Sequence, residues 1–109
     1  MNVLMDNISI FYSQNVRLIK SLMKREFPEE YPEVFKWKVQ MLYFDGKAWI
    51  EICRIDNYLH QQQAGSHIHE YKKEQVAWVP LTFQEAEKLI KEKSMKILKE
   101  KFNQIRYLR

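Results

Sequence analysis

The feature that most constrains the fold is an alternation of side chains over residues 35–43, in which apolar residues take every second position. Lysine and glutamine side chains stand between the first four of these apolar residues. A period of two is typical of a strand that buries one face. The dipeptide Asp45-Gly46 follows, and it is typical of a two-residue hairpin turn. We therefore predict an antiparallel hairpin at the centre of the fold.

The register of this hairpin decides which side chains share a face. A two-residue turn sets Met41 opposite Ile50, and further apolar pairs then fall on the same face. The same register places Arg54 beside Trp37, at the far end of the buried face. The sequence therefore predicts that the chain leaves the sheet near Arg54.

Upstream of the hairpin, the apolar residues recur at steps of three and four, which predicts an amphipathic helix over residues 13–27. Ser13 can serve as the N-cap of this helix. Pro28 cannot continue the helix, so the helix should end before it. Residues 1–11 suit either a helical extension or a short strand. The apolar residues of the predicted helical face are Tyr12, Val16, Ile19, Met23 and Phe27.

Downstream of the hairpin, residues 67–71 and 75–79 have the pattern of two further short strands, and Pro80 ends the second. Thr82 followed by Glu85 forms a capping box, which predicts the start of a long helix. One side of that helix is apolar. Its apolar residues are Phe83, Ala86, Ile90, Ile97, Ile105 and Leu108.

Together these elements predict a single α+β domain over residues 1–109. The predicted domain has an N-terminal helix, a four-stranded mainly antiparallel sheet, and a long C-terminal helix packed on one face. A chain of 109 residues can build one core without metal or disulfide staples.

Cysteine usage and hydropathy bear on the compartment. The single cysteine, Cys53, excludes an intramolecular disulfide and fits a reducing compartment. Residues 1–12 lack the basic start of a signal peptide. No stretch approaches the roughly 20 apolar residues of a membrane span. We therefore expect a cytoplasmic protein without a membrane partner.

Positive charge gathers in the predicted C-terminal helix. The net charge of the chain is +4, and from Thr82 onward eight lysines and arginines stand against four glutamates. Such a surface can attract RNA, DNA or an acidic partner. The candidate nucleic-acid contacts are Lys88, Lys91 and Lys99. The alternative is an ordinary solvated helix face.

The residues able to carry chemistry gather in residues 53–71, which hold all three histidines of the chain. Residues two apart in a strand project to the same face, so His67 and His69 should point together. Two imidazoles on one face can act as general acid and base, or bind a metal. The alternative is a pair of exposed histidines on an edge strand. His60 lies close enough in sequence to join them.

Arg54 and Asp56 share a strand face by the same rule. An unpaired buried charge is costly, so the two residues either form an ion pair over Trp37 or leave Arg54 to grip a phosphate. We predict that Cys53 is a small buried residue. Apart from Arg54, no positive neighbour in the sequence could activate its thiolate.

The order of these motifs resembles that of a known family. Arg-Ile-Asp-Asn at 54–57 is followed by His60, by His-Ile-His at 67–69, and by a Thr-capped helix that begins near Leu81. Over about residues 41–98, this arrangement resembles the TumE-type toxins of prokaryotic toxin–antitoxin pairs. The resemblance implies a growth-inhibiting toxin that acts on RNA and is held silent by an antitoxin protein.

The resemblance also implies which residues carry the activity. By position they are Arg54, Asp56, His60, His67 and His69. The glutamines at 61–63 and the predicted helix before Phe27 depart from the family's pattern.

We therefore favour an RNA-cleaving function. One histidine would take the proton of a ribose 2′-hydroxyl, another would protonate the leaving oxygen, and Arg54 would steady the phosphate. This mechanism requires no metal or other cofactor. In a metal-binding variant the three histidines and Asp56 would be ligands. The competing class is a non-catalytic module, either a homodimer or a partner-bound protein, whose C-terminal helix forms the interface and whose histidines are incidental.

Overall fold

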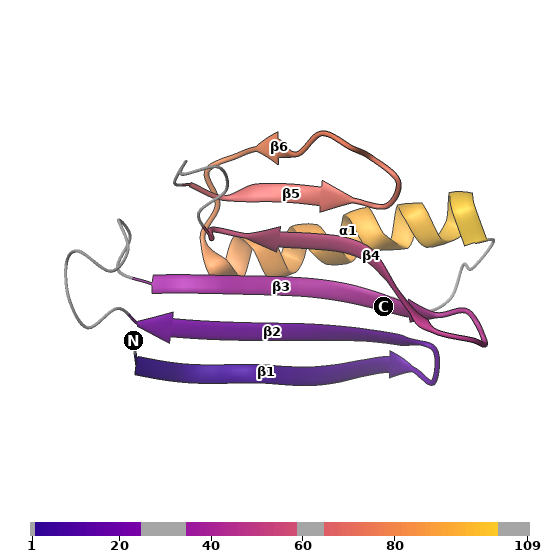
Figure 1. The fold of residues 1–109 in the computed structure, drawn as a ribbon, viewed down its shortest axis with the longest axis horizontal. Helices are drawn as coiled ribbons and strands as arrows, with labels where there is room; N and C mark the ends of the chain where they lie inside the picture. Colours follow the sequence, from indigo (N-terminus) through magenta and orange to yellow (C-terminus); the bar gives the residue numbers. More distant parts are fainter. Residues whose placement is uncertain (1, 25–34, 59–64, 103–109) are drawn as a thin grey trace.

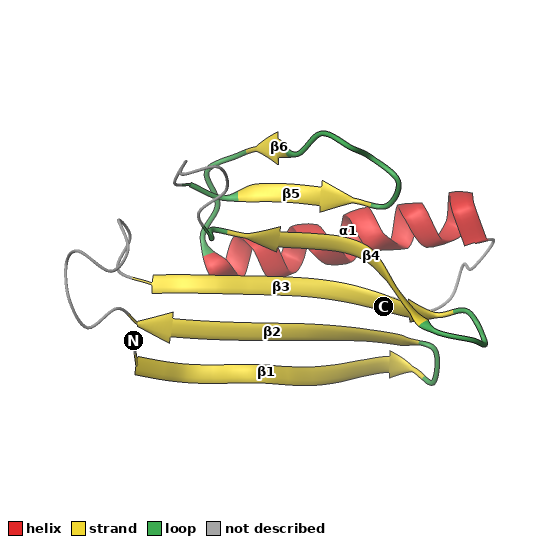
Figure 2. Cartoon of the chain, viewed as in Figure 1, coloured by secondary structure: helices red, strands yellow, loops and turns green. Residues whose placement is uncertain are grey.

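The hairpin around Asp45 is the middle of a larger antiparallel sheet in the computed structural model, which describes residues 2–24, 35–58 and 65–102 (Figures 1 and 2). The six strands of the described chain lie side by side in sequence order, each antiparallel to the next, and one helix follows them. The elements are β1 (Asn2–Ser13), β2 (Val16–Lys24), β3 (Phe35–Phe44), β4 (Trp49–Asp56), β5 (His67–Glu70), β6 (Ala77–Trp78) and α1 (Phe83–Phe102).

The predicted N-terminal helix and the four-stranded sheet are both wrong, because β1 and β2 occupy that part of the chain. Val16 and Leu18 alternate with polar or half-buried residues, and both are fully buried through pairing with β3. The spacing of these apolar residues fits the period of a helix as well as that of a strand. Pairing with β3 makes the segment a strand. Ser13 accepts a hydrogen bond from the backbone N–H of Asn15 at 3.1 Å in the β1–β2 turn, rather than capping a helix. Phe27 lies outside the described residues.

The turn after β3 is placed correctly, but its loop is longer than predicted. Asp45 Oδ1 accepts hydrogen bonds from the backbone N–H groups of Lys47 at 2.8 Å and Ala48 at 3.0 Å. Gly46 has a φ of 100°, in the region that favours glycine. The ladder of β3 and β4 resumes only at Phe44 and Trp49.

The register of β3 and β4 differs from the prediction accordingly. Met41 lies opposite Cys53 rather than Ile50: the longer loop accounts for two residues of this shift, and a bulge after Met41 accounts for the third. Arg54 consequently pairs with Gln40 instead of lying beside Trp37. Because neighbouring strand residues point to opposite faces, this shift carries Arg54 away from the buried face.

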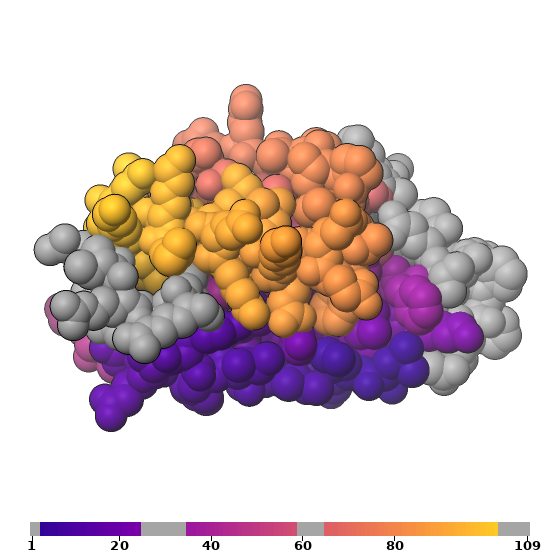
Figure 3. All heavy atoms as spheres, turned by 180° about the vertical axis from the view of Figure 1, so that it is seen from behind, coloured from indigo at the N-terminus to yellow at the C-terminus, as the bar shows by residue number. Residues whose placement is uncertain are grey.

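Helix α1 lies along one face of the sheet, as predicted, and covers it when the molecule is seen from behind (Figure 3). The predicted capping box is confirmed: the N–H of Thr82 donates to Glu85 Oε1 at 2.8 Å, and the N–H of Glu85 donates to Thr82 Oγ1 at 3.1 Å. Lys20 Nζ on β2 lies 2.9 Å from Glu87 Oε1 on the helix. The fully or nearly fully buried helix residues are Ala86, Ile90, Ser94 and Leu98.

Alternation along the strands divides the sheet into two faces. Val39 and Ile55 are paired neighbours that point toward α1 and belong to the core. Gln40 and Arg54, one residue along, therefore point to the other side. We call this other side of β2–β5 the open face, because no helix of the described chain covers it. The one helix of the described residues is too polar to cross a membrane.

Candidate functional site

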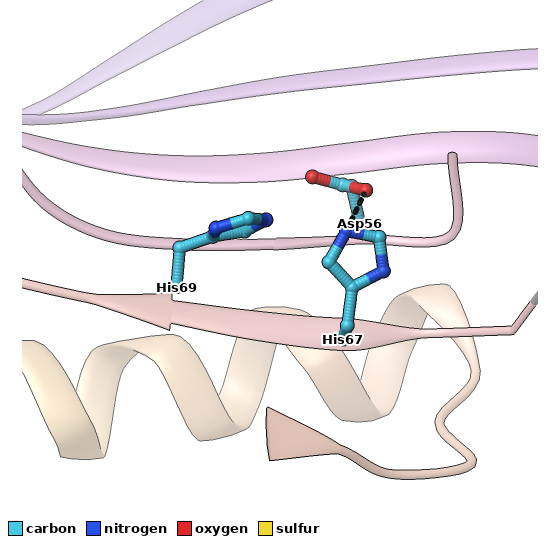
Figure 4. Close-up of side chains that lie close together, drawn as sticks. All are labelled: Asp56, His67 and His69. Atoms are coloured by element: carbon cyan, nitrogen blue, oxygen red, sulfur yellow. Dashed lines mark ion pairs between the residues drawn. The ribbon is translucent and has the colours of Figure 1, made fainter. Parts of the chain in front are cut away.

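Four of the five predicted catalytic residues meet on the open face. Arg54 and Asp56 come from β4, and His67 and His69 come from β5. The antiparallel register sets Asp56 directly opposite His67 and Arg54 directly opposite His69. Directly opposed residues of such a pair have neighbouring side chains, and Figure 4 shows Asp56 pointing toward His67 with His69 beside them. We call these four residues the histidine cluster.

Asp56 is the hub of the histidine cluster. Its Oδ1 lies 3.1 Å from His67 Nε2 and accepts a hydrogen bond from the backbone N–H of Tyr58 at 3.0 Å (Figure 4). Its Oδ2 lies 3.1 Å from Arg54 Nε. Asp56 and His67 are only 3% and 2% exposed. The carboxylate therefore fixes the His67 ring through one nitrogen, as an orienting group fixes a catalytic imidazole.

Arg54 takes part in two ion pairs. Besides its contact with Asp56, its Nη1 lies 3.6 Å from Glu51 Oε2, and its side chain is 34% exposed. The Arg54–Asp56 ion pair considered from the sequence is thus present. It does not cover Trp37, which belongs to the core on the helix side of the sheet. Arg54 is paired directly with His69 across the two strands.

His69 differs from His67 in its surroundings. Its ring centroid lies 4.8 Å from that of His67 in an edge-on arrangement. Burial lowers the pKa of His69 from its ordinary value, and the nearby charge of Arg54 lowers it further, against the opposing effect of Asp56. His69 is only partly buried. The lowered pKa favours the neutral imidazole, which is the form that a general base needs.

One aromatic neighbour of the site was not among the predicted site residues. The ring of Trp78 on β6 lies 4.7 Å from that of His67. Because β6 pairs Trp78 directly with His67, the contact follows from the strand order. The sequence did predict two short strands after residue 66. The spacing of residues could not show that these strands would pair His67 with Trp78.

Two buried polar residues hold the ends of β4 and β5 in place. Asn57 accepts a hydrogen bond from the N–H of Trp37 and donates one to the carbonyl of Phe35, both at 2.8 Å. The hydroxyl of Ser66 donates to the carbonyl of Val79 and accepts from the N–H of Leu81. These side chains anchor the residues next to Asp56 and His67.

The metal-binding variant can be tested against the same geometry. Asp56, His67 and His69 each offer one ligand atom, and these atoms lie within 4.8 Å of one another. A tetrahedral zinc site with bonds of about 2 Å would bring its ligand atoms to roughly 3.3 Å apart. The guanidinium of Arg54 already occupies the carboxylate of Asp56, and its charge opposes a bound cation. The histidine cluster fits proton transfer better than metal ligation.

The remaining predicted site residues lie elsewhere. His60 is outside the described residues. Lys88 and Lys99 are exposed on α1, and Lys91 Nζ lies 3.9 Å from Glu87 Oε2 on the same helix. Helix α1 covers the face opposite the histidine cluster, so the structure does not bring these lysines together with the histidines.

Cys53 is buried, as predicted. It is 0% exposed, and burial raises the pKa of its thiol to about 12, with the charge of Glu70 adding to the effect. A thiol of this kind stays protonated at physiological pH and is a poor nucleophile. Cys53 therefore belongs to the core and has no place in the site.

Comparisons with known proteins identify no family for this chain. No protein-family model, curated protein or solved structure matches it. Function is therefore inferred from the geometry of the histidine cluster and from the motifs at 54–57 and 67–69.

Proposed function

We propose that the chain is a toxin-like protein that cleaves RNA by acid–base catalysis at the histidine cluster. The observation that carries the proposal is the Asp56–His67 pair beside His69, a second imidazole whose pKa is lowered. Two neighbouring imidazoles in different environments are suited to opposite roles, one as base and one as acid. The motif resemblance to TumE-type toxins points to the same substrate and to control by an antitoxin.

The proposed reaction is a transesterification within the RNA strand. Neutral His69 takes the proton of a ribose 2′-hydroxyl, and the 2′ oxygen forms a bond to the adjacent phosphorus. The bond from phosphorus to the 5′ oxygen of the next nucleotide breaks. His67 gives the proton on its Nδ1 to that leaving oxygen, while the N–H at its Nε2 keeps its hydrogen bond to Asp56. The products are a 2′,3′-cyclic phosphate and a 5′-hydroxyl, and no metal is required.

Arg54 supplies the charge that this reaction needs. Its guanidinium is partly exposed beside His69 and can stabilise the extra negative charge on the phosphate in the transition state. His67 is nearly inaccessible, so its side chain has to become exposed when the substrate binds. Catalytic contacts often form fully only in the substrate complex.

The test is cleavage of a defined RNA by the purified protein in excess chelator. The wild type should give fragments with 2′,3′-cyclic phosphate ends, and a substrate with a 2′-deoxy residue at the cleaved position should stay intact. His69→Ala should lose cleavage by about 10²-fold or more and should no longer arrest bacterial growth. Lys88→Gln, on the other face of the sheet, is the matched control. Full activity in His69→Ala, or activity only with added metal, contradicts the proposal.

A second candidate function is a non-catalytic interaction module. The C-terminal helix, which would form the interface of such a module, packs Leu98 and Phe102 within the chain: Leu98 is 1% exposed, and the ring of Phe102 lies 5.0 Å from that of Tyr43. The observation that favours a module is instead the edge strand β1, which exposes large apolar side chains. An exposed apolar edge can pair with another chain. Oligomerisation that persists in a chain without RNA-cleaving activity would favour this candidate.

A further inference from the structure

A second group of side chains occupies the open face, at the opposite end of the strands from Asp56. The guanidinium carbon of Arg17 lies 4.4 Å from the ring centroid of Trp49 and 5.8 Å from that of Phe11. Phe44 completes the group, with its ring 5.4 Å from that of Trp49. Phe11 is 58% exposed. We call these four residues the aromatic platform.

The charge of Arg17 is not balanced by a carboxylate. Among the described residues, no aspartate or glutamate forms an ion pair with it. The carboxylate in the same cross-strand row is Glu51, two strands away. Glu51 already accepts a hydrogen bond from Gln40 at 2.8 Å and lies 3.6 Å from Arg54. The cation stacked on Trp49 is thus available to an anionic ligand.

The aromatic platform and the histidine cluster lie on the same face of the sheet. Arg17 and Arg54 are separated by two strands and by two positions along them. With about 4.8 Å between strands and about 3.4 Å per residue, their Cα atoms are roughly 12 Å apart. A chain of a few nucleotides can span such a distance while it contacts both groups.

We propose that the open face binds single-stranded RNA, with a phosphate on Arg17 and a base stacked on the aromatic platform, and leads the strand to the histidine cluster. This inference rests on the proposed function for the identity of the nucleic acid as RNA. Aromatic side chains stack on unpaired bases of any sequence, whereas the bases of a duplex are already stacked. The substrate is accordingly an unpaired segment rather than a double helix.

The net charge of +2 is the same for the open face and for helix α1, so the exposed aromatic rings decide between them. On the described part of β2–β5, four cations stand against two carboxylates on the open face. They are Arg17, Lys36, Lys38 and Arg54, against Glu51 and Asp56. Arg17 belongs to the aromatic platform, Arg54 belongs to the histidine cluster, and Lys38 is paired with Asp56 across the strands. Helix α1 has six lysines and four glutamates, but its exposed large apolar residue is a methionine, Met95. On the open face an arginine stacks on Trp49 beside the exposed ring of Phe11, whereas the helix itself exposes no large aromatic side chain among its described residues.

The experiment measures binding of a single-stranded 2′-O-methyl RNA octamer, which this reaction cannot cleave, by fluorescence anisotropy at several salt concentrations. Arg17→Gln should weaken binding several-fold and reduce the salt dependence by about one phosphate contact. Phe11→Ala should weaken it about fivefold or more if a base stacks there. The double variant Lys88→Gln/Lys99→Gln is the matched control and should bind as the wild type does. A duplex of the same sequence should bind more weakly.

A further variant keeps the test valid if Arg17→Gln disturbs the fold. Arg17→Lys keeps the charge but loses the flat guanidinium, so it should restore most of the salt-dependent binding. Normal binding by both Arg17→Gln and Phe11→Ala overturns the inference. So does a larger loss in the helix double variant, equal binding of the duplex, or an absence of binding to any of these probes.

The outcomes also separate this inference from the proposed function. If the protein binds the octamer through Arg17 but never cleaves RNA, the proposed binding surface is supported and the proposed catalytic function is wrong. If cleavage depends on His69 but is unchanged by Arg17→Gln, the catalytic function is supported and the proposed binding surface is wrong.

Discussion

The two faces of the sheet are built from the same strands, yet they hold different kinds of side chains. The face under α1 is lined by apolar residues of β2–β5, such as Val39 and Ile55, which are fully buried. The open face carries the ion pairs of Arg54 and Asp56, both histidines of β5, and the Arg17–Trp49 stack. The helix-covered face holds the fold together, and the open face is available for chemistry.

The comparison teaches that stability and function can be changed separately in this chain. A side chain on the helix-covered face is fixed by packing, so its loss affects the whole molecule. A partly exposed charge on the open face contributes little to stability. Variants of the two faces should therefore give different patterns of unfolding and activity, which four predictions make specific.

The largest effect on stability should come from the helix-covered face. Ile55→Ala removes a side chain that is 0% exposed, and it should lower the free energy of unfolding by about 2–5 kcal/mol through lost burial and the cavity that remains. Lys38→Gln, on the open face of the neighbouring strand, should change it by less than about 0.5 kcal/mol. Urea unfolding of both variants checks the contrast, and similar losses would contradict it.

The largest effect on activity should come from the open face. Asp56→Asn keeps the shape of the side chain but removes the charge that orients His67 and pairs with Arg54. Cleavage should fall by about 10²-fold or more. Because Asp56 raises the pKa of His69, the pKa measured by NMR titration should also fall in this variant. Cleavage at the wild-type rate would show that the Asp56–His67 pair is structural only.

A smaller effect concerns the pH dependence of stability. The pKa of His69 is lowered in the folded chain, so the unfolded chain binds a proton more readily than the folded one. The contribution of His69 to the free energy of unfolding is therefore present above the unfolded pKa of about 6.5 and is lost as pH falls below it. The loss ends once the folded pKa has been passed.

Two variants isolate this contribution. Urea unfolding at pH 8 and pH 5 gives the decline in the free energy of unfolding between these pH values. In His69→Gln this decline should be smaller than in the wild type, because the contribution of His69 is missing. Arg54→Gln should raise the pKa of His69 in an NMR titration, because the charge of Arg54 lowers it. A wild type and a His69→Gln variant with the same pH dependence of unfolding would contradict the assigned direction.

The smallest effect should come from the exposed lysines of the helix. Lys88→Gln/Lys99→Gln changes two exposed side chains and should alter the free energy of unfolding by less than about 0.5 kcal/mol. Cleavage of RNA should stay close to the wild-type rate, because the substrate is proposed to lie on the other face. A clear loss of cleavage in single-turnover assays would show that the RNA contacts the lysines of α1 instead.

Local patterns predicted the parts of the fold that local contacts determine. The capping box of Thr82 and Glu85 depends on four consecutive residues, and it was correct. A strand was one of two alternatives for residues 1–11, and the structure confirms it. Strand β2 was missed because Val16 and Ile19 fit a helical period as well as their strand setting. Their state depends on β3, which lies about twenty residues further along the chain.

The site was predictable to the same extent. The rule that residues two apart share a face grouped Arg54 with Asp56 and His67 with His69, and the structure confirms both pairs. The contact between the pairs depends on the register of β4 and β5, and the face they occupy depends on the bulge after Met41. The side chains of Arg17 and Trp49 meet across β3, so no spacing in the sequence could indicate their stack.

The central claim is that the open face carries a metal-free acid–base site in which His69 is the base. Its most direct test is the pH profile of single-turnover RNA cleavage in excess chelator. The profile should be bell-shaped, with an acidic limb below pH 6.5 that reports His69, and Arg54→Gln should move that limb to higher pH. A profile without an acidic limb, a limb unmoved by Arg54→Gln, or cleavage abolished by the chelator would contradict the claim.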